Sequence, residues 1–111
     1  MPKQKLIAAA LLPLVLCVVA ARAQPATASK QPSASAGQQI FVQKCMQCHS
    51  VNKDQVLLGP SLWGEMTKSP HKKTAAQIRV IIKNGKGKMP PWGTMLSEDD
   101  INNVLAYLHS L

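Results

Sequence analysis

Apolar and polar positions divide this chain of 111 residues into three stretches of different character. An apolar run spans Leu6 to Ala21, interrupted by Pro13. Residues 24–36 are rich in Ala, Ser, Pro and Gln and show no apolar periodicity, which predicts a flexible tail. Residues 37–111 show helical spacing and no alternation of period two long enough for a strand. The pattern therefore predicts a single all-α domain over residues 37–111.

The first helix is expected from Gly37 to about Gln47. Phe41, Cys45 and Cys48 recur there at i, i+4 and i+7, so they share one side of a helix. After polar, turn-forming residues, Gly59-Pro60 predicts an extended loop, and a short helix is expected over residues 62–67.

Two further helices carry their own start signals. Thr74 and Gln77 have the spacing of a capping box, and Gly85 stands where a left-handed residue ends a helix, which predicts a helix to Asn84. Ser97 precedes three acidic residues that would stabilise the positive end of a last helix. The expected apolar stripes are Ile78, Ile81 and Ile82 in the former and Ile101, Val104, Leu105 and Leu108 in the latter.

The N-terminal stretch has the form of a signal peptide. Lys3 and Lys5 precede the apolar run, and Ala21-Arg22-Ala23 matches the small-x-small form of a cleavage site. An uncleaved anchor is the alternative, but the run is shorter than the roughly 20 apolar residues that a spanning helix needs. We expect residues 1–23 to be a cleaved signal peptide, the protein to be periplasmic, and no stable membrane insertion to remain after cleavage.

The formal net charge of +8 indicates a basic surface. Lys3, Lys5 and Arg22 would leave with the signal peptide, so the exported protein would keep a smaller positive surplus. Such a surplus aids solubility and steers a protein toward an acidic patch on a partner. Nucleic acid is not an expected partner, because an exported protein does not ordinarily meet it and no fold motif for it is present.

Two cysteines three positions apart, followed at once by a histidine, form Cys45-Met46-Gln47-Cys48-His49. This spacing is the attachment pattern of a c-type haem, in which both sulfurs form thioethers with the porphyrin and the imidazole ligates the iron. A disulfide oxidoreductase with a reactive dithiol is one alternative, but it needs a strand-rich pattern. A zinc module is another, but only the isolated His71 and His109 are available to complete it. The haem interpretation is favoured.

Over residues 37–111 the chain resembles the class I cytochromes c, and the bacterial type more than the mitochondrial one. Besides C-x-x-C-H, the matching segments are Gly37-Gln38-Gln39-Ile40-Phe41-Val42-Gln43-Lys44, Gly59-Pro60, Lys88-Met89-Pro90 and Leu105-Ala106-Tyr107-Leu108. The resemblance implies a small all-α fold of three to four helices around one covalent haem c. It also implies that the first and last helices cross closely near Gly37 and Tyr107.

The resemblance further implies a cofactor site formed by Cys45, Cys48, His49, Met89 and Pro60. His49 and Met89 would be the axial iron ligands, with Met95 as the alternative sulfur donor. The Pro60 carbonyl would accept a hydrogen bond from the second ring nitrogen of His49. Trp63 and Trp92 are expected to pack in the core rather than donate to a haem propionate. The lysines that could rim the haem edge are Lys44, Lys53, Lys72, Lys73, Lys86 and Lys88.

The expected function is one-electron transfer between redox protein partners, by a monomer that docks through an acidic patch on the partner. The chain shows neither paired carboxylates nor a nucleophile with a positioned base, so no catalysis is expected. Two alternatives keep the haem: an electron-transfer subunit of a periplasmic dehydrogenase or oxidase complex, and a ligand sensor with an open iron position.

Overall fold

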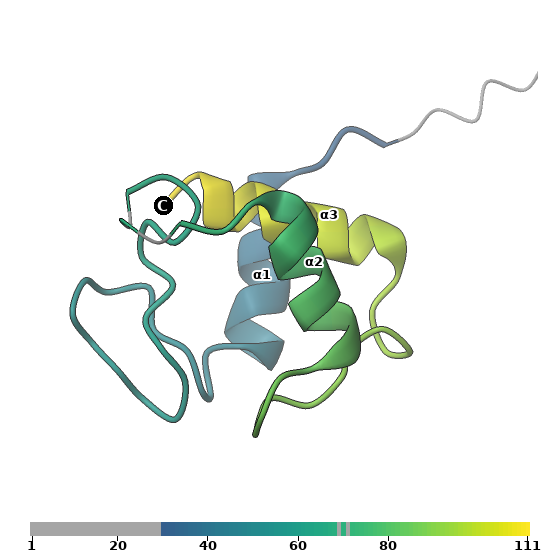
Figure 1. Ribbon diagram of the computed structural model, residues 1–111. Coiled ribbons are helices and arrows are strands. Elements are labelled where there is room, and N and C mark those ends of the chain that lie inside the picture. Colours follow the sequence, from purple (N-terminus) through teal and green to yellow (C-terminus); the bar gives the residue numbers. More distant parts are fainter. Residues whose placement is uncertain (1–29, 69, 71) are drawn as a thin grey trace, which may run out of the picture.

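The computed structural model describes residues 30–68, 70 and 72–111, and this part of the chain forms three helices (Figure 1). They are α1 (Ala34–Lys44), α2 (Ala75–Asn84) and α3 (Glu98–His109). Within the same residues, the only strand-like pairing is an isolated bridge between Lys86 and Met89. The expected all-α fold is confirmed. The expected signal peptide lies outside the described residues.

Helix α1 begins and ends earlier than the sequence pattern predicted. The Ser33 side chain accepts a hydrogen bond from the backbone N–H of Ala36 and so caps the helix. Residues 34–36 therefore belong to α1, and their assignment to the flexible tail was wrong. At the other end, Lys44 is the last helical residue, and residues 45–48 form turns rather than the predicted helical continuation. These turns separate the two thiols from the helix proper.

Helices α1 and α3 cross (Figure 1), and Gly37 lies at their contact. A Cβ atom placed on Gly37 would lie 1.9 Å from the backbone oxygen of Asn103 and 2.9 Å from the nitrogen of Val104. Phe41, one turn later, packs against Tyr107 with the ring centroids 5.5 Å apart. The expected crossing is confirmed. The residues of α3 that approach Gly37 are Asn103 and Val104, whereas Tyr107 contacts Phe41.

The capping box predicted for α2 is present, and the cap predicted at Ser97 of α3 is also a capping box. Thr74 caps α2 together with Gln77, Ser97 caps α3 together with Asp100, and α2 ends before Gly85 as predicted. The predicted short helix over residues 62–67 is wrong, because this segment forms only turns. The buried apolar core consists of Phe41, Ile78, Ile82, Ile101, Val104, Leu105, Tyr107 and Leu108. Ile81 is half-buried, so the α2 stripe is narrower than expected.

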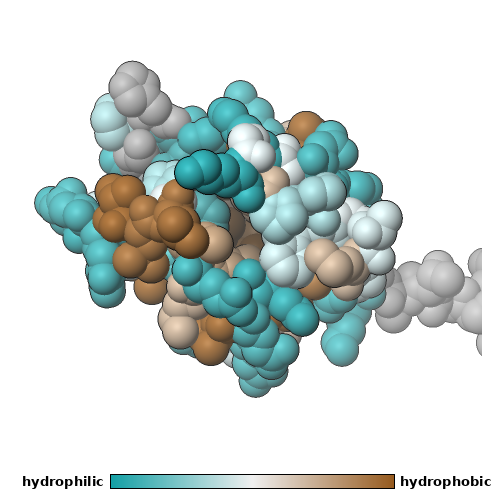
Figure 2. Space-filling model, turned by 90° about the horizontal axis from the view of Figure 1, so that it is seen from below, coloured by the Kyte–Doolittle hydropathy of each residue, from teal (hydrophilic) through white to brown (hydrophobic). Residues whose placement is uncertain are grey.

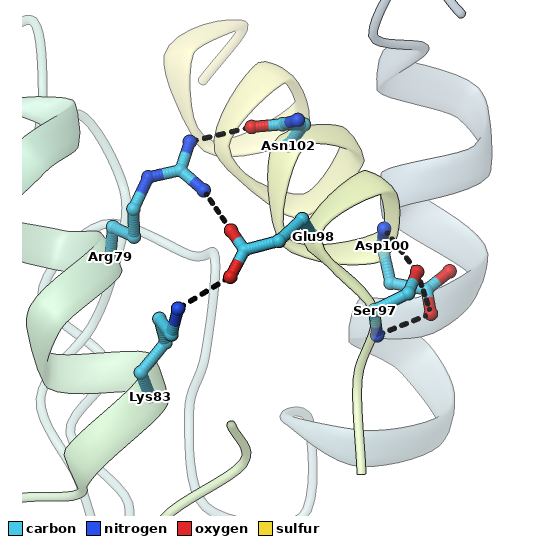
Figure 3. A network of polar contacts seen from close by, with 6 residues as sticks. All are labelled: Arg79, Lys83, Ser97, Glu98, Asp100 and Asn102. Carbon is cyan, nitrogen blue, oxygen red and sulfur yellow. Dashed lines mark hydrogen bonds and ion pairs between the residues drawn. The ribbon is translucent and has the colours of Figure 1, made fainter. Parts of the chain in front are cut away.

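Glu98 joins α2 to α3 at the protein surface (Figure 3). Its carboxylate accepts from Lys83 and from the Arg79 guanidinium, whose N–O distance is 3.0 Å. The same guanidinium donates to the Asn102 side chain at 2.5 Å. The hydrogen bond from Lys83 is the main cause that holds the pKa of Glu98 below its ordinary value of 4.5. The network therefore stabilises the α2–α3 arrangement only while Glu98 is ionised.

We expect Glu98→Gln to lower the thermal midpoint at neutral pH and to have no effect in strong acid. A carboxyl whose folded pKa is depressed adds stability above its unfolded pKa, and this stability is lost as the pH falls through the folded pKa. Melting curves of both proteins from pH 7 downward should converge below pH 4.5. Asp99→Asn is the matched control, because Asp99 carries the same charge in the same helical turn but lies outside the network of Figure 3. An equal loss in both variants would contradict the role of the ion pairs.

Candidate haem-binding site

Cys45 and Cys48 lie directly after α1, where Cys45 is the C-cap residue. The turn is closed by backbone hydrogen bonds from Cys48 and His49 to the Cys45 carbonyl, at 3.0 and 2.9 Å. Both cysteines are half-buried and are not joined in a disulfide, and Cys45 packs against the core. Burial, together with the neighbouring Cys48, raises the pKa of Cys45 to about 11, so its thiol is uncharged at neutral pH. Cys45 thus lies at the edge of the apolar core, and the turn that it shares with Cys48 follows directly after α1.

His49 is oriented by the loop that contains Gly59 and Pro60. Its Nδ1 lies 2.9 Å from the Pro60 carbonyl oxygen, and a carbonyl only accepts, so Nδ1 carries the proton in this hydrogen bond. The other ring nitrogen, Nε2, is then the basic one and suits a metal. The backbone N–H of Gly59 donates to the Cys48 carbonyl at 2.8 Å, which fixes this loop beside the cysteine turn.

Gly59 gives the imidazole its space. A Cβ atom at this position would lie 2.5 Å from Cε1 and 2.8 Å from Nδ1 of His49. Sequence reasoning treated Gly59 as a loop former and missed this contact, although a glycine directly before a residue expected to bond His49 is compatible with such a close approach.

We expect Gly59→Ala to displace the His49 ring and to weaken its bond to Pro60. The haem spectrum of the purified protein should change, and the yield of protein with haem should fall severalfold, because a contact of 2.5 Å forces the ring to move. Pro60→Ala is the control, since the acceptor is a backbone carbonyl that alanine retains. Equal spectra for Gly59→Ala and the parent protein would contradict this positioning of the ring.

Met89 lies in a loop held against the end of α2. Backbone hydrogen bonds pair Lys86 with Met89 in both directions at 3.0 and 3.1 Å, and Gly85 enters the loop with a φ of 73°. After the two prolines, the Trp92 N–H donates to the Ile82 carbonyl at 2.9 Å, which ties the loop back to α2. Met89 is half-buried and packs against the core.

The other methionines differ from Met89 in burial or position. Met95 is 61% exposed and Met46 is 51% exposed, whereas Met66 packs against the core. Trp92 is half-buried and also packs against the core, as predicted. His109 is exposed at the end of α3, and His71 lies outside the described residues. Met89 is half-buried in a loop bounded by glycines and prolines, and this favours Met89 over Met95 as the candidate sulfur ligand.

The donor set fits a c-type haem better than a bare metal ion. Within residues 30–68, 70 and 72–111, no group of three His, Cys, Asp or Glu side chains is arranged to hold an ion. The two thiols, the basic nitrogen of His49 and a half-buried thioether instead supply the attachment and ligand chemistry of haem c. Figure 2 shows that one face of the molecule is hollowed, with a group of apolar side chains along one side of the hollow and more hydrophilic ones around the rest. An apolar ring would complete such a surface.

Comparisons with known proteins agree with this chemistry. Residues 32–108 match the family model described as cytochrome c oxidase, cbb3-type, subunit III. Cytochrome c6 from Picosynechococcus sp. is 34% identical over 95% of this chain and 92% of that protein. Cytochrome c6 from Diacronema lutheri is 35% identical over 67% of this chain and 90% of that protein. The crystal structure of cytochrome c6 from the diatom Phaeodactylum tricornutum superimposes with a TM-score of 0.57 at 32% identity, covering 70% and 92% of the two chains.

The fold and site thus define a haem-binding electron-transfer protein. The chain belongs to the class I monohaem cytochromes c, within the family of cbb3-type oxidase subunit III and similar to cytochrome c6. Its cofactor is a covalent haem c, in keeping with the spacing of Cys45 and Cys48. It is an electron carrier rather than an enzyme, and it exchanges electrons with redox protein partners. No helix in the described part of the chain has the length and apolar character needed to cross a membrane.

Proposed function

We propose that this protein is a periplasmic one-electron carrier whose haem iron is ligated by His49 and Met89. The observation that carries the proposal is the state of the imidazole: Nδ1 is engaged by the Pro60 carbonyl at 2.9 Å, directly after the cysteine pair. This bond fixes one tautomer and makes Nε2 the better donor. Cys45 and Cys48 would hold the cofactor covalently, and the bond to Pro60 restrains the His49 ring so that Nε2 would be available to the iron.

Met89 supplies the second ligand in this proposal. The turn between Lys86 and Met89, the two following prolines and the Trp92–Ile82 hydrogen bond restrict where the thioether can lie. A thioether is a soft, neutral donor that favours ferrous iron and so raises the reduction potential. When bound, the haem supplies reversible one-electron chemistry, and the protein's residues set its potential and exclude water from its faces.

The charge distribution supports docking on an acidic partner. Exposed lysines occur at the end of α1 and in the loops after α1 and α2, whereas the acidic first turn of α3 is part of a cap and of the Glu98 network. The exposed cations in question are Lys44, Lys53, Lys72, Lys86 and Lys88. Such a surface accelerates encounter with an acidic patch and leaves docking weak and short-lived. The carrier acts as a monomer, exported by residues 1–23 with residues 24–33 as a spacer, and binds neither nucleic acid nor membrane.

A second candidate is a haem-bearing electron-transfer subunit of a periplasmic dehydrogenase or oxidase complex. The family model that matches residues 32–108 is described as an oxidase subunit. In addition, Val56, Leu57 and Leu58 are 72%, 44% and 80% exposed, which is unusual for three consecutive apolar residues. A permanent oxidase or dehydrogenase partner would cover them. The native size of the protein purified without detergent separates the two candidates, because the free carrier runs as a monomer.

Intact mass and visible spectra of the periplasmic protein test the main proposal on one sample. The expected mass is that of residues 24–111 plus one haem. The expected ferric spectrum includes the weak near-infrared band that reports sulfur ligation of iron. A haem spectrum without this band would replace the proposed ligand pair with an open or bis-histidine site, and a mass without haem would overturn the proposed site altogether.

A further inference from the structure

The ammonium groups of two lysines from different segments lie over the Trp63 ring. Lys68 Nζ is 4.5 Å from the ring centroid, and Lys53 Nζ is 5.7 Å from it. Both distances are within the range of attraction between a cation and an aromatic face, which is strongest for tryptophan. Lys68 Nζ also donates to the backbone oxygen of Leu111, the last residue of the chain. The half-buried indole therefore contacts a lysine of the loop before it and a lysine of the turn after it, and Lys68 extends this contact to Leu111.

The backbone around Trp63 is continuous with the loop that orients His49. Trp63 is three residues after Pro60, and its N–H donates to the Ser61 hydroxyl at 3.2 Å. That hydroxyl donates to the Asn52 carbonyl at 2.7 Å, and the Leu62 N–H donates to the Ser50 carbonyl at 2.8 Å. Residues 59–63 thus form a strip fixed at one end by the His49–Pro60 bond and at the other by the Trp63 side chain.

We propose that Trp63, held by Lys53 and Lys68, is a positioning residue that keeps the Pro60 carbonyl on Nδ1 of His49 and thereby tunes the haem iron. This inference rests on the proposed ligation by His49. Pro60 is exposed, so its carbonyl is restrained through its backbone neighbours: the Gly59 N–H donates to the Cys48 carbonyl on one side, and the segment up to Trp63 follows on the other. The large side chains of that segment are Leu62 and Trp63. Leu62 packs against the core, whereas Trp63 is bound by groups on either side of it in the sequence.

The direction of the effect follows from the hydrogen bond. A carbonyl acceptor on Nδ1–H increases the basicity of the ligating nitrogen, which favours ferric iron. When the strip loosens, the bond is broken for a larger fraction of the time, and ferrous iron is favoured instead. Removal of a nearby positive charge acts in the opposite sense, because it stabilises the more positive ferric state. If the His49–Pro60 bond is weakened, the reduction potential of the haem rises. If only a nearby positive charge is lost, the reduction potential falls.

The test compares Trp63→Ala with Trp63→Phe in the haem-loaded protein. For Trp63→Ala we expect exchange of the His49 Nδ1–H proton in the ferrous protein, followed by NMR, to accelerate at least tenfold. We also expect the ferrous-to-ferric ratio at a fixed solution potential to rise about threefold to tenfold, an upward shift of about 30 to 59 mV. Trp63→Phe retains an aromatic face and should restore most of both values.

Amide exchange in α3 and two lysine variants complete the test. Lys68→Met keeps the aliphatic stem and should also accelerate His49 proton exchange, whereas Lys72→Met, an exposed lysine outside the Trp63 contacts, should not. Lys68→Met keeps the test decisive if Trp63→Ala fails to fold. The proposal is overturned if His49 exchange is unchanged, if Phe is no better than Ala, or if α3 amides accelerate equally. Absence of the near-infrared band in the parent protein would instead overturn the ligation, independently of Trp63.

Discussion

Met89→Ala is expected to abolish the near-infrared sulfur-to-iron band and to let the ferrous protein bind carbon monoxide stoichiometrically. In the parent protein we expect no binding of the gas, since His49 and Met89 would fill both axial positions under the proposed ligation. The reduction potential should fall in the variant, because water or another hard donor replaces a thioether that favours ferrous iron. The measurements are the ferric near-infrared spectrum, a carbon monoxide titration of the dithionite-reduced protein, and a redox titration.

Met95→Ala is the matched control for this change. It removes a thioether six residues away, but one that is 61% exposed, so all three readouts should match those of the parent protein. The reverse result, with Met95→Ala losing the band, would assign the sulfur ligand to Met95. Binding of carbon monoxide by the unchanged protein would favour the ligand-sensor interpretation. A parent protein that refuses the gas while Met89→Ala takes it would exclude that interpretation.

Both ends of α2 and the start of α3 could be predicted from the sequence because each depends on residues within one turn. Thr74 with Gln77, and Ser97 with Asp100, satisfy backbone groups locally, and Gly85 ends α2 by its own conformation. The start of α1 was harder to predict from the sequence. Ser33 caps it, but the N–H of Ser33 also donates to the Asn103 side chain at 2.8 Å, 70 residues away in the sequence. Contacts at this separation leave no local signal.

For the site, the sequence predicts which residue types supply the chemistry, but not how they are arranged in space. The cysteine pair and His49 follow from spacing alone, and a methionine loop follows from its glycines and prolines. The space that Gly59 leaves for the imidazole and the lysine contacts of Trp63 depend on how residues 50–68 fold back. That segment lacks apolar periodicity, so the sequence does not determine how it folds. The short helix predicted over residues 62–67 was wrong for this reason.

Gly37→Ala is expected to destabilise the protein, although alanine is the better helix former. At an exposed helical position, alanine is favoured over glycine by about 0.8–1 kcal/mol. At Gly37 the added Cβ would lie 1.9 Å from the backbone oxygen of Asn103, so α1 and α3 would have to separate. Overpacking of this kind costs about 1–3 kcal/mol. A change of that size lowers the thermal midpoint of so small a domain by about 4–8 °C per kcal/mol.

The exposed neighbour Gln38 provides the reference for this prediction. Gln38→Ala should be more stable than Gln38→Gly, because nothing opposes the Cβ atom on the outer face of α1. At position 37 the order should reverse, with glycine more stable than alanine in thermal and denaturant melts. Since the clash involves backbone, no side-chain rotamer relieves it, and larger residues should lose more. The same order at both positions would show that the helices are not in close contact at Gly37. A reversal would instead show that the crossing of α1 and α3, on which the placement of Phe41 and both thiols depends, requires glycine there.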